Sequence, residues 1–478
     1  MRTEVWPRAV LDLLAGAGDR PVFEDGERVV GAAEMLALIR RTAAGLRGAG
    51  VGPGRGVALM LDVTPEAFAA TIAAFAVGAR VSGIRPGLTP GQLGHLLSRD
   101  DALLISDADL PALLASPDEP LVAAGRPGDI ARIIYTSGST GNPKGCAQTY
   151  AAMTAAWAPY PDRWPPAIRE LASRLGRYLV FGSLSSQVML EYGILTLAAG
   201  GTLVVAHPPA FPDAIVEHRA TASVITVGKL YQLVRDQRPN PVDLSGLRAL
   251  MVSGSPIGPG RLREAQEVLG PVVFHGYGQT ETGMIAMVTP GEMASSEAAL
   301  GSVGRPPPAV DVAIRAGELF VRTPAQAAGY WDDPAETAEV FVDGWVRTRD
   351  LAALDADGYL RLLGRVRDVI IVNANLVYAG PIERILASDP DVAEAYVVGR
   401  PDEETGEAIH AYVVPALGRV PDAAALRKSV VERLGEAAVP RTVTLIDQVP
   451  LAPSGKPDKR AFLLTDPRGE STVRADIS

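Results

Sequence analysis

The chain has one cysteine, few lysines and no long apolar run. Cys146 is the single cysteine in 478 residues, which excludes an internal disulfide and any cysteine-rich metal site. No apolar stretch reaches the roughly 18 residues that a membrane span needs. The first 20 residues carry acidic side chains and predict an amphipathic helix instead of a signal peptide. We therefore expect a cytoplasmic protein with no membrane partner.

Acidic residues outnumber basic ones. The formal net charge is -10, which excludes a general nucleic-acid-binding protein, because such proteins present a basic surface. Almost all basic residues are arginines, so chemistry that needs a compact ammonium group has few candidates. The lysines are Lys144, Lys229, Lys428, Lys456 and Lys459.

The spacing of apolar residues predicts an α/β fold. Segments 32–46 and 65–77 have helical periodicity, and residues 56–61 between them have the composition of a buried strand. The alternation continues beyond residue 220 and predicts packed sheets with crossover helices. From residue 310, four short strand-like segments separated by Gly and Asp turns predict a small β subdomain.

Residues 365–478 predict a compact α+β unit. Its expected strands and helices lie at 370–372, 392–398, 408–414 and 443–446, and at 381–387 and 422–434. We therefore predict two domains, a large N-terminal α/β domain at 1–364 and a smaller C-terminal domain at 365–478. The polar final residues predict a disordered tail. The sequence does not indicate an oligomeric state.

A segment rich in glycine and hydroxyl groups follows the strand-like residues 132–135. Its sequence over 135–145 is YTSGSTGNPKG. Glycines let backbone N–H groups approach a polyphosphate, while nearby hydroxyls and a lysine add donors and positive charge. The spacing differs from the usual NTPase P-loop. The candidate nucleotide-binding residues here are Thr136, Ser137, Gly138, Ser139, Thr140 and Lys144.

A second motif, GYGQTETG, occupies residues 276–283 after the strand-like residues 271–274. The ring of Tyr277 can stack on a base, the hydroxyl of Thr280 can contact phosphate, and the carboxylate of Glu281 can hold Mg²⁺. We include Gly276 and Gly278 in the same candidate nucleotide site.

Three shorter motifs complete a series. Asp350 lies in WVRTRDL, Arg365 and Arg367 lie in GRVRD, and Lys456 lies in PLAPSGKPDKR. Across residues 20–465, the five motifs in this order resemble the adenylate-forming superfamily of acyl-CoA synthetases, peptide-synthetase adenylation domains and luciferases. The resemblance implies a ligase that uses ATP and Mg²⁺, with a large α/β domain and a small mobile C-terminal domain.

The resemblance also implies a role for each motif. The first motif would hold the β- and γ-phosphates of ATP, Tyr277 would contact adenine, Thr280 the phosphate and Glu281 the metal. Asp350 would bind the ribose hydroxyls, and Arg365 the ribose or phosphate.

Two further parts of the site follow from the resemblance. Gly254 and Ser255 lie in a turn similar to the family's Gly-Gly-Ala-Pro turn, which borders the acyl and adenine sites. Lys456 would stabilise charge as the substrate carboxylate attacks the α-phosphate, a role of positioning and electrostatics. The predicted catalytic residues are Lys456, Thr280 and Glu281.

The acid pocket departs from the family pattern. Many relatives have Pro-Leu-Phe-His where this chain has FGSLSSQ at 181–187, so Ser185 or Ser186 stands near the expected histidine. Ser185, Gln187, Lys229 and Gly276 are candidate contacts to the acid. Lys229 would pair with an anionic group of the substrate or with Glu191, or would extend to solvent.

A loop that lines the thiol channel in thioester-forming relatives is also altered. Ala374 stands at the usual Gly, Ala379 at the usual Pro, and Pro381 at the usual first Glu of the loop Ala374–Pro381. The added methyl group would narrow the channel or change the backbone angle there. The alternative is drift without consequence.

Three functions are compatible with these patterns. The first is activation of a small acid, aryl acids included, as acyl-AMP, followed by transfer to CoA or to the thiol of a separate carrier protein. The second keeps adenylation but transfers the acid to an amine, as amide ligases do, or activates nitrite for an arylamine. The third is a nucleotide-binding protein without catalysis.

Overall fold

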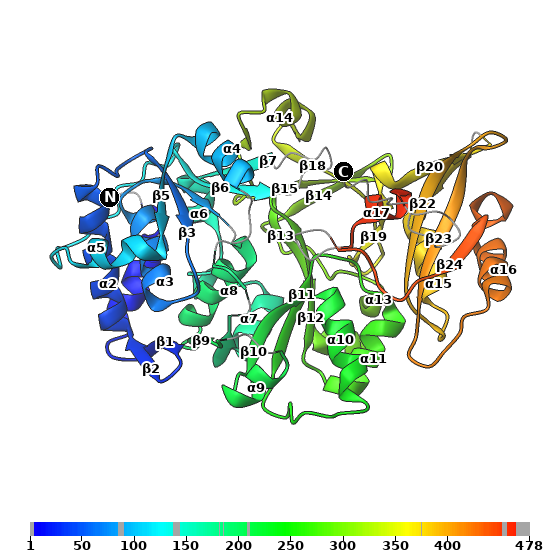
Figure 1. The fold of residues 1–478 in the computed structure, drawn as a ribbon, viewed down its shortest axis with the longest axis horizontal. Coiled ribbons are helices and arrows are strands. Elements are labelled where there is room, and N and C mark those ends of the chain that lie inside the picture. The colour runs from blue at the N-terminus through cyan, green and yellow to red at the C-terminus, as the bar shows by residue number, and fades with distance from the viewer. Residues whose placement is uncertain are drawn as a thin grey trace, which may run out of the picture.

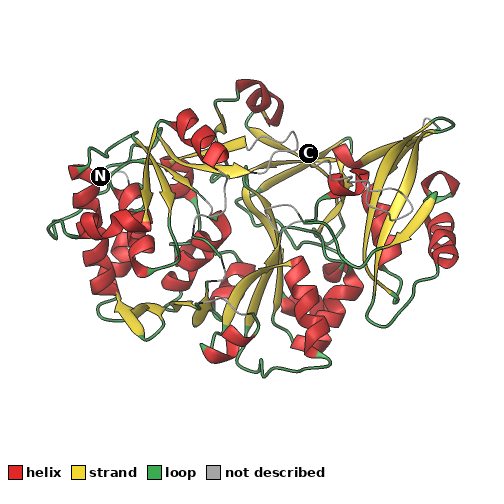
Figure 2. Ribbon diagram, viewed as in Figure 1, coloured by secondary structure: helices red, strands yellow, loops and turns green. Residues whose placement is uncertain are grey.

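The computed structural model describes residues 4–84, 90–136, 144–180, 182–184, 186–207, 211–373, 375–451 and 457–464. They form a large N-terminal domain with three sheets and a smaller C-terminal domain with one (Figure 1). Helices lie beside the strands of both domains (Figure 2). The predicted fold class is therefore confirmed.

The largest sheet has eight strands, parallel in its interior and antiparallel at both edges. Its strands, in spatial order, are β13 (Gly283–Val288), β12 (Val273–Gln279), β11 (Ala249–Ser253), β10 (Ala222–Thr226), β8 (Arg177–Leu179), β9 (Thr202–Val205), β1 (Pro21–Asp25) and β2 (Arg28–Gly31).

The second sheet has six strands, and the third is a five-stranded antiparallel sheet that matches the predicted β subdomain. The six are β16 (Gly329–Trp331), β7 (Lys144–Thr149), β6 (Ile130–Thr136), β4 (Arg80–Gly83), β3 (Gly56–Met60) and β5 (Ala102–Ser106). The five are β14 (Asp311–Arg315), β15 (Glu318–Arg322), β18 (Trp345–Leu354) and β17 (Phe341–Val342), with β19 (Leu360–Arg365) paired to β18.

The C-terminal domain is built on the fourth sheet. Its strands are β21 (Asn375–Tyr378), β20 (Val369–Val372), β23 (Gly406–Pro415) and β22 (Val392–Asp402), with β24 (Thr442–Leu445) paired to β23. Its helices are α15 (Ala379–Ala387), α16 (Ala423–Leu434) and α17 (Lys459–Leu464).

The helices of the large domain cover its sheets. They are α1 (Arg8–Gly16), α2 (Ala32–Gly48), α3 (Pro65–Ala76), α4 (Pro90–Asp100), α5 (Leu110–Leu114), α6 (Tyr150–Ala155), α7 (Pro166–Ala172), α8 (Gln187–Ala198), α9 (Asp213–Glu217), α10 (Val227–Gln237), α11 (Pro259–Leu269), α12 (Pro290–Ser295), α13 (Glu297–Leu300) and α14 (Pro334–Val340). Short 3₁₀ turns lie at Asp107–Asp109, Pro161–Arg163, Val366–Asp368 and Glu436–Ala438.

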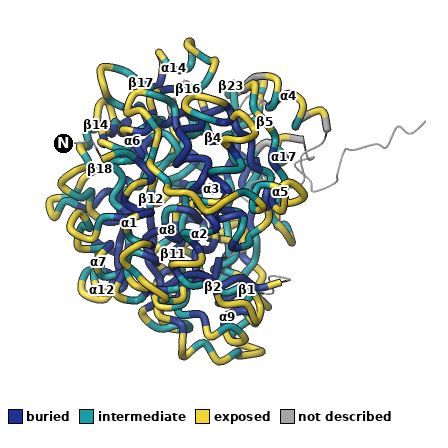
Figure 3. Tube along the Cα trace, turned by 90° about the vertical axis from the view of Figure 1, so that its left-hand side faces the viewer, coloured by how far each residue is buried: buried dark blue, intermediate teal, exposed yellow. Residues whose placement is uncertain are grey.

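Helix α3 shows how local sequence sets these elements. Thr64 caps it by accepting a hydrogen bond from the backbone of Ala67, and Pro65 occupies the first turn, where no N–H partner is needed. Nearly every later residue is apolar and buried, so α3 is an interior helix (Figure 3).

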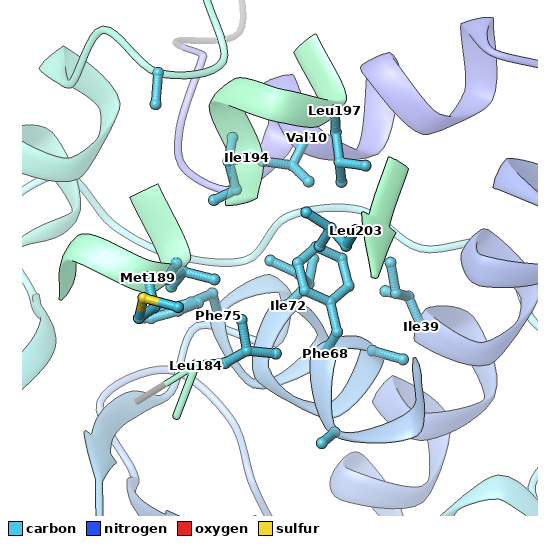
Figure 4. Close-up of a cluster of buried hydrophobic side chains, with 14 of the residues drawn as sticks. Val10, Ile39, Phe68, Ile72, Phe75, Leu184, Met189, Ile194, Leu197 and Leu203 are labelled. Carbon is cyan, nitrogen blue, oxygen red and sulfur yellow. The ribbon is translucent and has the colours of Figure 1, made fainter. Parts of the chain in front are cut away.

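The main core lies where α1, α2, α3 and α8 meet. Figure 4 shows Val10 of α1, Phe68 and Phe75 of α3, and Ile194 and Leu197 of α8 directed toward one another. Burying one such side chain contributes about 1.5–3 kcal/mol, so this cluster holds α8 firmly in place.

Two segments differ from the sequence-based expectation. The GYGQTETG motif does not begin after its strand, because β12 runs on to Gln279 and pairs with β13. The prediction of a loop at Ala374–Pro381 is also wrong. In the described part of this segment, β21 pairs with β20, and α15 begins at Ala379. Asn373 has a positive φ of 49°, which suits the chain reversal between β20 and β21.

Candidate active site

The second motif forms an antiparallel hairpin. Thr280, Glu281 and Thr282 make the turn between β12 and β13. A Cβ atom at Gly278 would lie 2.3 Å from the carbonyl oxygen of Gly283, so this position needs glycine for close strand packing. The hairpin presents the Thr-Glu pair at its tip on a rigid support.

The side chain of Asp350 joins three of the predicted motifs. Its Oδ2 accepts hydrogen bonds from the Tyr277 hydroxyl at 2.6 Å and from Gln279 Nε2 at 2.8 Å. Its Oδ1 accepts one from Arg365 Nε at 3.1 Å. Burial and the neighbouring Asp350 charge raise the pKa of Tyr277, so this hydroxyl stays a donor at neutral pH.

Lys144 lies at the start of β7 in a second cluster. Its Nζ is 2.7 Å from Glu336 Oε1, and the same oxygen is 2.9 Å from Arg349 Nη1. Burial alone would raise the pKa of Glu336, but the hydrogen bonds from Lys144 and Arg349 lower it below its ordinary value. Two cations therefore meet beside the end of the first motif.

Tyr330 on β16 connects this cluster to the hairpin tip. Its hydroxyl donates a hydrogen bond of 2.6 Å to Glu281 Oε1, and Lys144 Nζ lies 5.8 Å from its ring centre. Burial and the Glu281 carboxylate raise the pKa of Tyr330, which keeps the phenol protonated. Glu281 is thereby fixed in one orientation.

The structure describes only some of the other predicted site residues. Ser137, Gly138, Ser139, Thr140, Ser185, Ala374 and Lys456 lie outside the described residues. Thr136 is the last residue of β6. Gly254 follows β11 with a positive φ of 98°, and the Ser255 carbonyl oxygen is 3.3 Å from His275 Nε2. Burial lowers the pKa of His275 to about 4, so it is neutral.

The C-terminal domain carries an ion cluster just after Lys456. Lys459 Nζ lies 2.9 Å from Asp368 Oδ2 and 2.8 Å from Glu383 Oε1. Burial would lower the pKa of Lys459, but the two carboxylates raise it. The cluster ties the start of α17 to α15 and to the turn before β20.

A cavity of about 640 Å³ opens beside the hairpin. Thr282, Gly283 and Met284 form part of its wall, and Gln187 lies in the same wall. The rest of the wall is mostly apolar, with residues that include Trp6, Met153, Trp157, Trp164, Pro307 and Pro308. Its volume and lining match those of small-molecule sites.

Lys229 and Glu191 lie on different helices. Lys229 lies in the first turn of α10, where its Nζ is 3.4 Å from Gln232 Oε1 and 5.8 Å from the Phe211 ring centre. Glu191 lies on α8 in the cavity wall. Gly276 is within β12, where an added Cβ would meet the Met251 side chain.

Models of two families match this chain. Residues 13–331 match the AMP-binding enzyme family, and residues 381–456 match the AMP-binding enzyme C-terminal domain. The chain belongs to the AMP-binding enzymes. The predicted superfamily is therefore confirmed, and this AMP-binding enzyme is an ATP-dependent adenylate-forming ligase.

Relatives of this AMP-binding enzyme are about one third identical to it over the matched residues. A medium/long-chain-fatty-acid–CoA ligase of Mycobacterium tuberculosis is 35% identical over 393 residues, which cover 76% of this chain and 66% of that enzyme. An indoleacetate–CoA ligase of Aromatoleum aromaticum is 31% identical, covering 90% of this chain and 92% of that enzyme. The solved structure of the amide bond synthetase McbA from Marinactinospora thermotolerans is 33% identical, with a TM-score of 0.83, covering 95% and 98%.

The donor set of this AMP-binding enzyme fits Mg²⁺ carried by a nucleotide. Among the described residues, no group of three or more His, Cys, Asp or Glu side chains could hold a metal ion. Mg²⁺ commonly takes one or two carboxylates together with substrate phosphates and water, so Glu281 alone suits it.

No helix in the described part of the chain is long and apolar enough to cross a membrane.

The sequence did not indicate several residues of this site. Tyr330 and Glu336 lie outside the recognised motifs, and Gln279 and Arg349 lie within motifs without an assigned role. The side chains of Tyr330 and Glu336 reach the site because β16 pairs with β7 and α14 follows β16. A pattern search along the chain has no signal for such cross-strand partners.

Proposed function

We propose that the enzyme activates a mainly apolar carboxylic acid, in the aryl to medium-chain range, and transfers it to the thiol of CoA. The observation that carries this proposal is the cavity of about 640 Å³ whose wall includes the residues directly after Thr280 and Glu281. An acid held there has its carboxylate end beside the proposed phosphate and metal contacts.

The proposed chemistry has two steps. A carboxylate oxygen attacks the α-phosphorus of ATP, the α–β phosphoanhydride bond breaks, and pyrophosphate leaves. The thiol sulfur then attacks the acyl carbonyl carbon, its proton is released, and AMP leaves with the mixed-anhydride bond broken. Bound Mg²⁺ would neutralise phosphate charge.

The residues of this chain would position the reactants. Asp350 would accept the ribose hydroxyls, Tyr277 would contact adenine, and Lys144 with residues 136–140 would hold the phosphates. Glu281, oriented by Tyr330, would hold Mg²⁺. Lys456 would follow the carboxylate oxygen into the transition state.

A second candidate replaces the thiol with an amine. It is favoured by Ala374, Ala379 and Pro381, which depart from the usual pattern of thioester-forming relatives. The similarity to an amide bond synthetase supports it as well. In this case the amine nitrogen attacks the acyl carbonyl, loses a proton and displaces AMP.

Pyrophosphate release with ATP and Mg²⁺ tests both candidates. Aliphatic acids, aryl acids and nitrite are each assayed with and without CoA, and with and without an arylamine. Acid-dependent release with a CoA thioester as product supports the thiol. Pyrophosphate release that does not depend on CoA, with an amide as product, supports transfer to an amine. Absence of any acid-dependent release refutes adenylation of these acids.

A further inference from the structure

One face of α8 carries a charged residue into the apolar cavity. Gln187, Leu190, Glu191 and Ile194, which recur at helical spacing, all line it. Glu191 is the one charged residue of α8, whose other members are mostly buried and apolar. In the described part of the chain, no group donates a hydrogen bond to the Glu191 carboxylate.

An arginine approaches the same space from the six-stranded sheet. Arg132 on β6 and Gln148 on β7 are register partners, and both line the cavity. Arg132 Nε donates to Gln148 Oε1 at 3.1 Å, and Gln148 Nε2 donates to the Ala325 carbonyl at 3.1 Å. The guanidinium is thus held by neighbours, while the Glu191 carboxylate remains open to the cavity.

A charged side chain among apolar groups costs folding free energy, because it loses contact with water. Burial raises the pKa of Glu191 to about 7, although the charge of Arg132 acts in the opposite direction. Burial also lowers the pKa of Arg132 to about 10. Carboxylates among apolar side chains normally accept hydrogen bonds from the protein, so the half-buried Glu191 carboxylate, which has no such donor, is suited to a ligand that supplies one.

We propose that Glu191, with Arg132 beside it, recognises a neutral hydrogen-bond donor on the distal part of the acid substrate. The substrate class is an acid with an aromatic or other large apolar body that carries a ring N–H or a hydroxyl group. This inference rests on the proposed function, because it takes the cavity as the acid pocket.

The charges and the wall of the cavity favour a neutral donor. A cationic group would be attracted by Glu191 but repelled by Arg132 and Arg163, which both line the cavity. It would also lose its water among the apolar side chains of the wall. A second carboxylate would face Glu191. An N–H or O–H group can donate to Glu191 without bringing a net charge into the cavity.

Matched pairs of acids test this specificity. One pair is 3-(4-hydroxyphenyl)propanoate and 3-phenylpropanoate, and another is indole-3-acetate and its N-methyl derivative. We expect the donor-bearing acid of at least one pair to have a kcat/KM for pyrophosphate release about tenfold higher or more, mainly through KM. Glu191→Leu should remove this preference, so that the two acids of a pair then have kcat/KM values within about twofold of each other.

Two control variants separate recognition from structural damage. Glu191→Gln keeps an acceptor oxygen and should keep part of the preference, while Glu217→Gln, at the exposed end of α9, should keep all of it. A wild-type enzyme without preference in any pair overturns the inference. So does a Glu191→Leu variant that lowers both acids of a pair equally.

Binding without turnover distinguishes this inference from the proposed function. Trp157 and Trp164 line the cavity, so quenching of tryptophan fluorescence reports acid binding. If the acids bind with the expected preference but release no pyrophosphate, the proposed function fails and the inference stands. If the acids are turned over without this preference, the proposed function stands and the inference fails.

Discussion

At the scale of single residues, the candidate site depends on side chains that orient the reactive ones. The Glu281 carboxylate would rotate freely at a hairpin tip, but Tyr330 donates to one of its oxygens. Asp350 is held in the same way by Tyr277, Gln279 and Arg365. Partners of this kind set the direction of a ligand atom and its readiness to bind a metal or hydroxyl.

Tyr330→Phe removes the donor to Glu281 and little else. We expect the Mg²⁺ concentration for half-maximal pyrophosphate release to rise about tenfold, because outer partners of metal ligands typically contribute that much. Tyr396→Phe is a matched control, since its hydroxyl donates to Glu394 in the C-terminal domain. Equal Mg²⁺ dependence in wild type and Tyr330→Phe would contradict the role of Tyr330.

The charge of Glu191 predicts a dependence of stability on pH. Its pKa is about 7 in the folded chain and near 4.5 when exposed, so the folded state holds the proton more tightly. The stability that this proton contributes is complete below about pH 4.5 and is lost as pH rises to about 7.

Glu191→Gln does not titrate and should escape this loss. We expect its melting temperature, relative to wild type, to rise by roughly 2–5 °C between pH 5 and pH 8. Thermal unfolding of both proteins in the same buffers measures the difference and cancels the other titrating groups. A difference that stays constant over this range would show that Glu191 titrates normally.

At the scale of elements, one lysine connects helix α17 to the first residues of the C-terminal domain and to α15. Lys459 is the first residue of α17, and its two carboxylate partners lie in the 3₁₀ turn Val366–Asp368 and in α15. Lys456, the predicted catalytic residue, stands three positions earlier in the chain. The cluster therefore restricts where the segment carrying Lys456 can lie.

Lys459→Met removes the ammonium group that Asp368 and Glu383 share. We expect a loss of about 1–3 kcal/mol in the stability of the C-terminal domain and a lower rate of pyrophosphate release. Lys428→Met on α16 is the control, because its pair with Glu432 is 3.8 Å long and largely exposed. Urea unfolding followed by proteolysis measures the first effect, and equal stability of the two variants would refute it.

At the scale of the whole molecule, the two domains meet through backbone carbonyl groups. Arg261 on α11 donates to the carbonyls of Val392 at 2.8 Å and Ala393 at 3.2 Å, at the start of β22. Arg384 on α15 donates to the carbonyl of Leu363 at 3.1 Å at the end of β19. Few such contacts suffice to hold one arrangement and can be exchanged when a domain moves. The boundary at 364/365 stays a prediction.

Arg261→Ala removes both hydrogen bonds to β22. We expect faster amide hydrogen exchange in residues 389–397, because this strand end loses its contact with the large domain. Arg263→Ala on the same helix loses only an exposed pair with Glu297 and should leave that exchange unchanged. Unchanged exchange in Arg261→Ala would mean that other contacts hold the domains together.

The sequence by itself determined the family, the fold class and most of the elements. Residues 32–46 and 422–434 were predicted as helices and correspond to α2 and α16, because helical periodicity is a local property. The motifs around Tyr277, Asp350 and Arg365 were predicted to share a site, and the structure brings these side chains together.

Only the tertiary structure decided which other side chains complete the site. Tyr330 is 49 residues from Glu281, and Gln148 is 177 residues from Ala325, so no local pattern relates them. The extension of β12 through Gly278 and the helical start at Ala379 were likewise set by pairing and packing. Strand register and the meeting of α8 with the six-stranded sheet put Glu191 and Arg132 in one cavity, because such contacts depend on distance in space and not on distance along the chain.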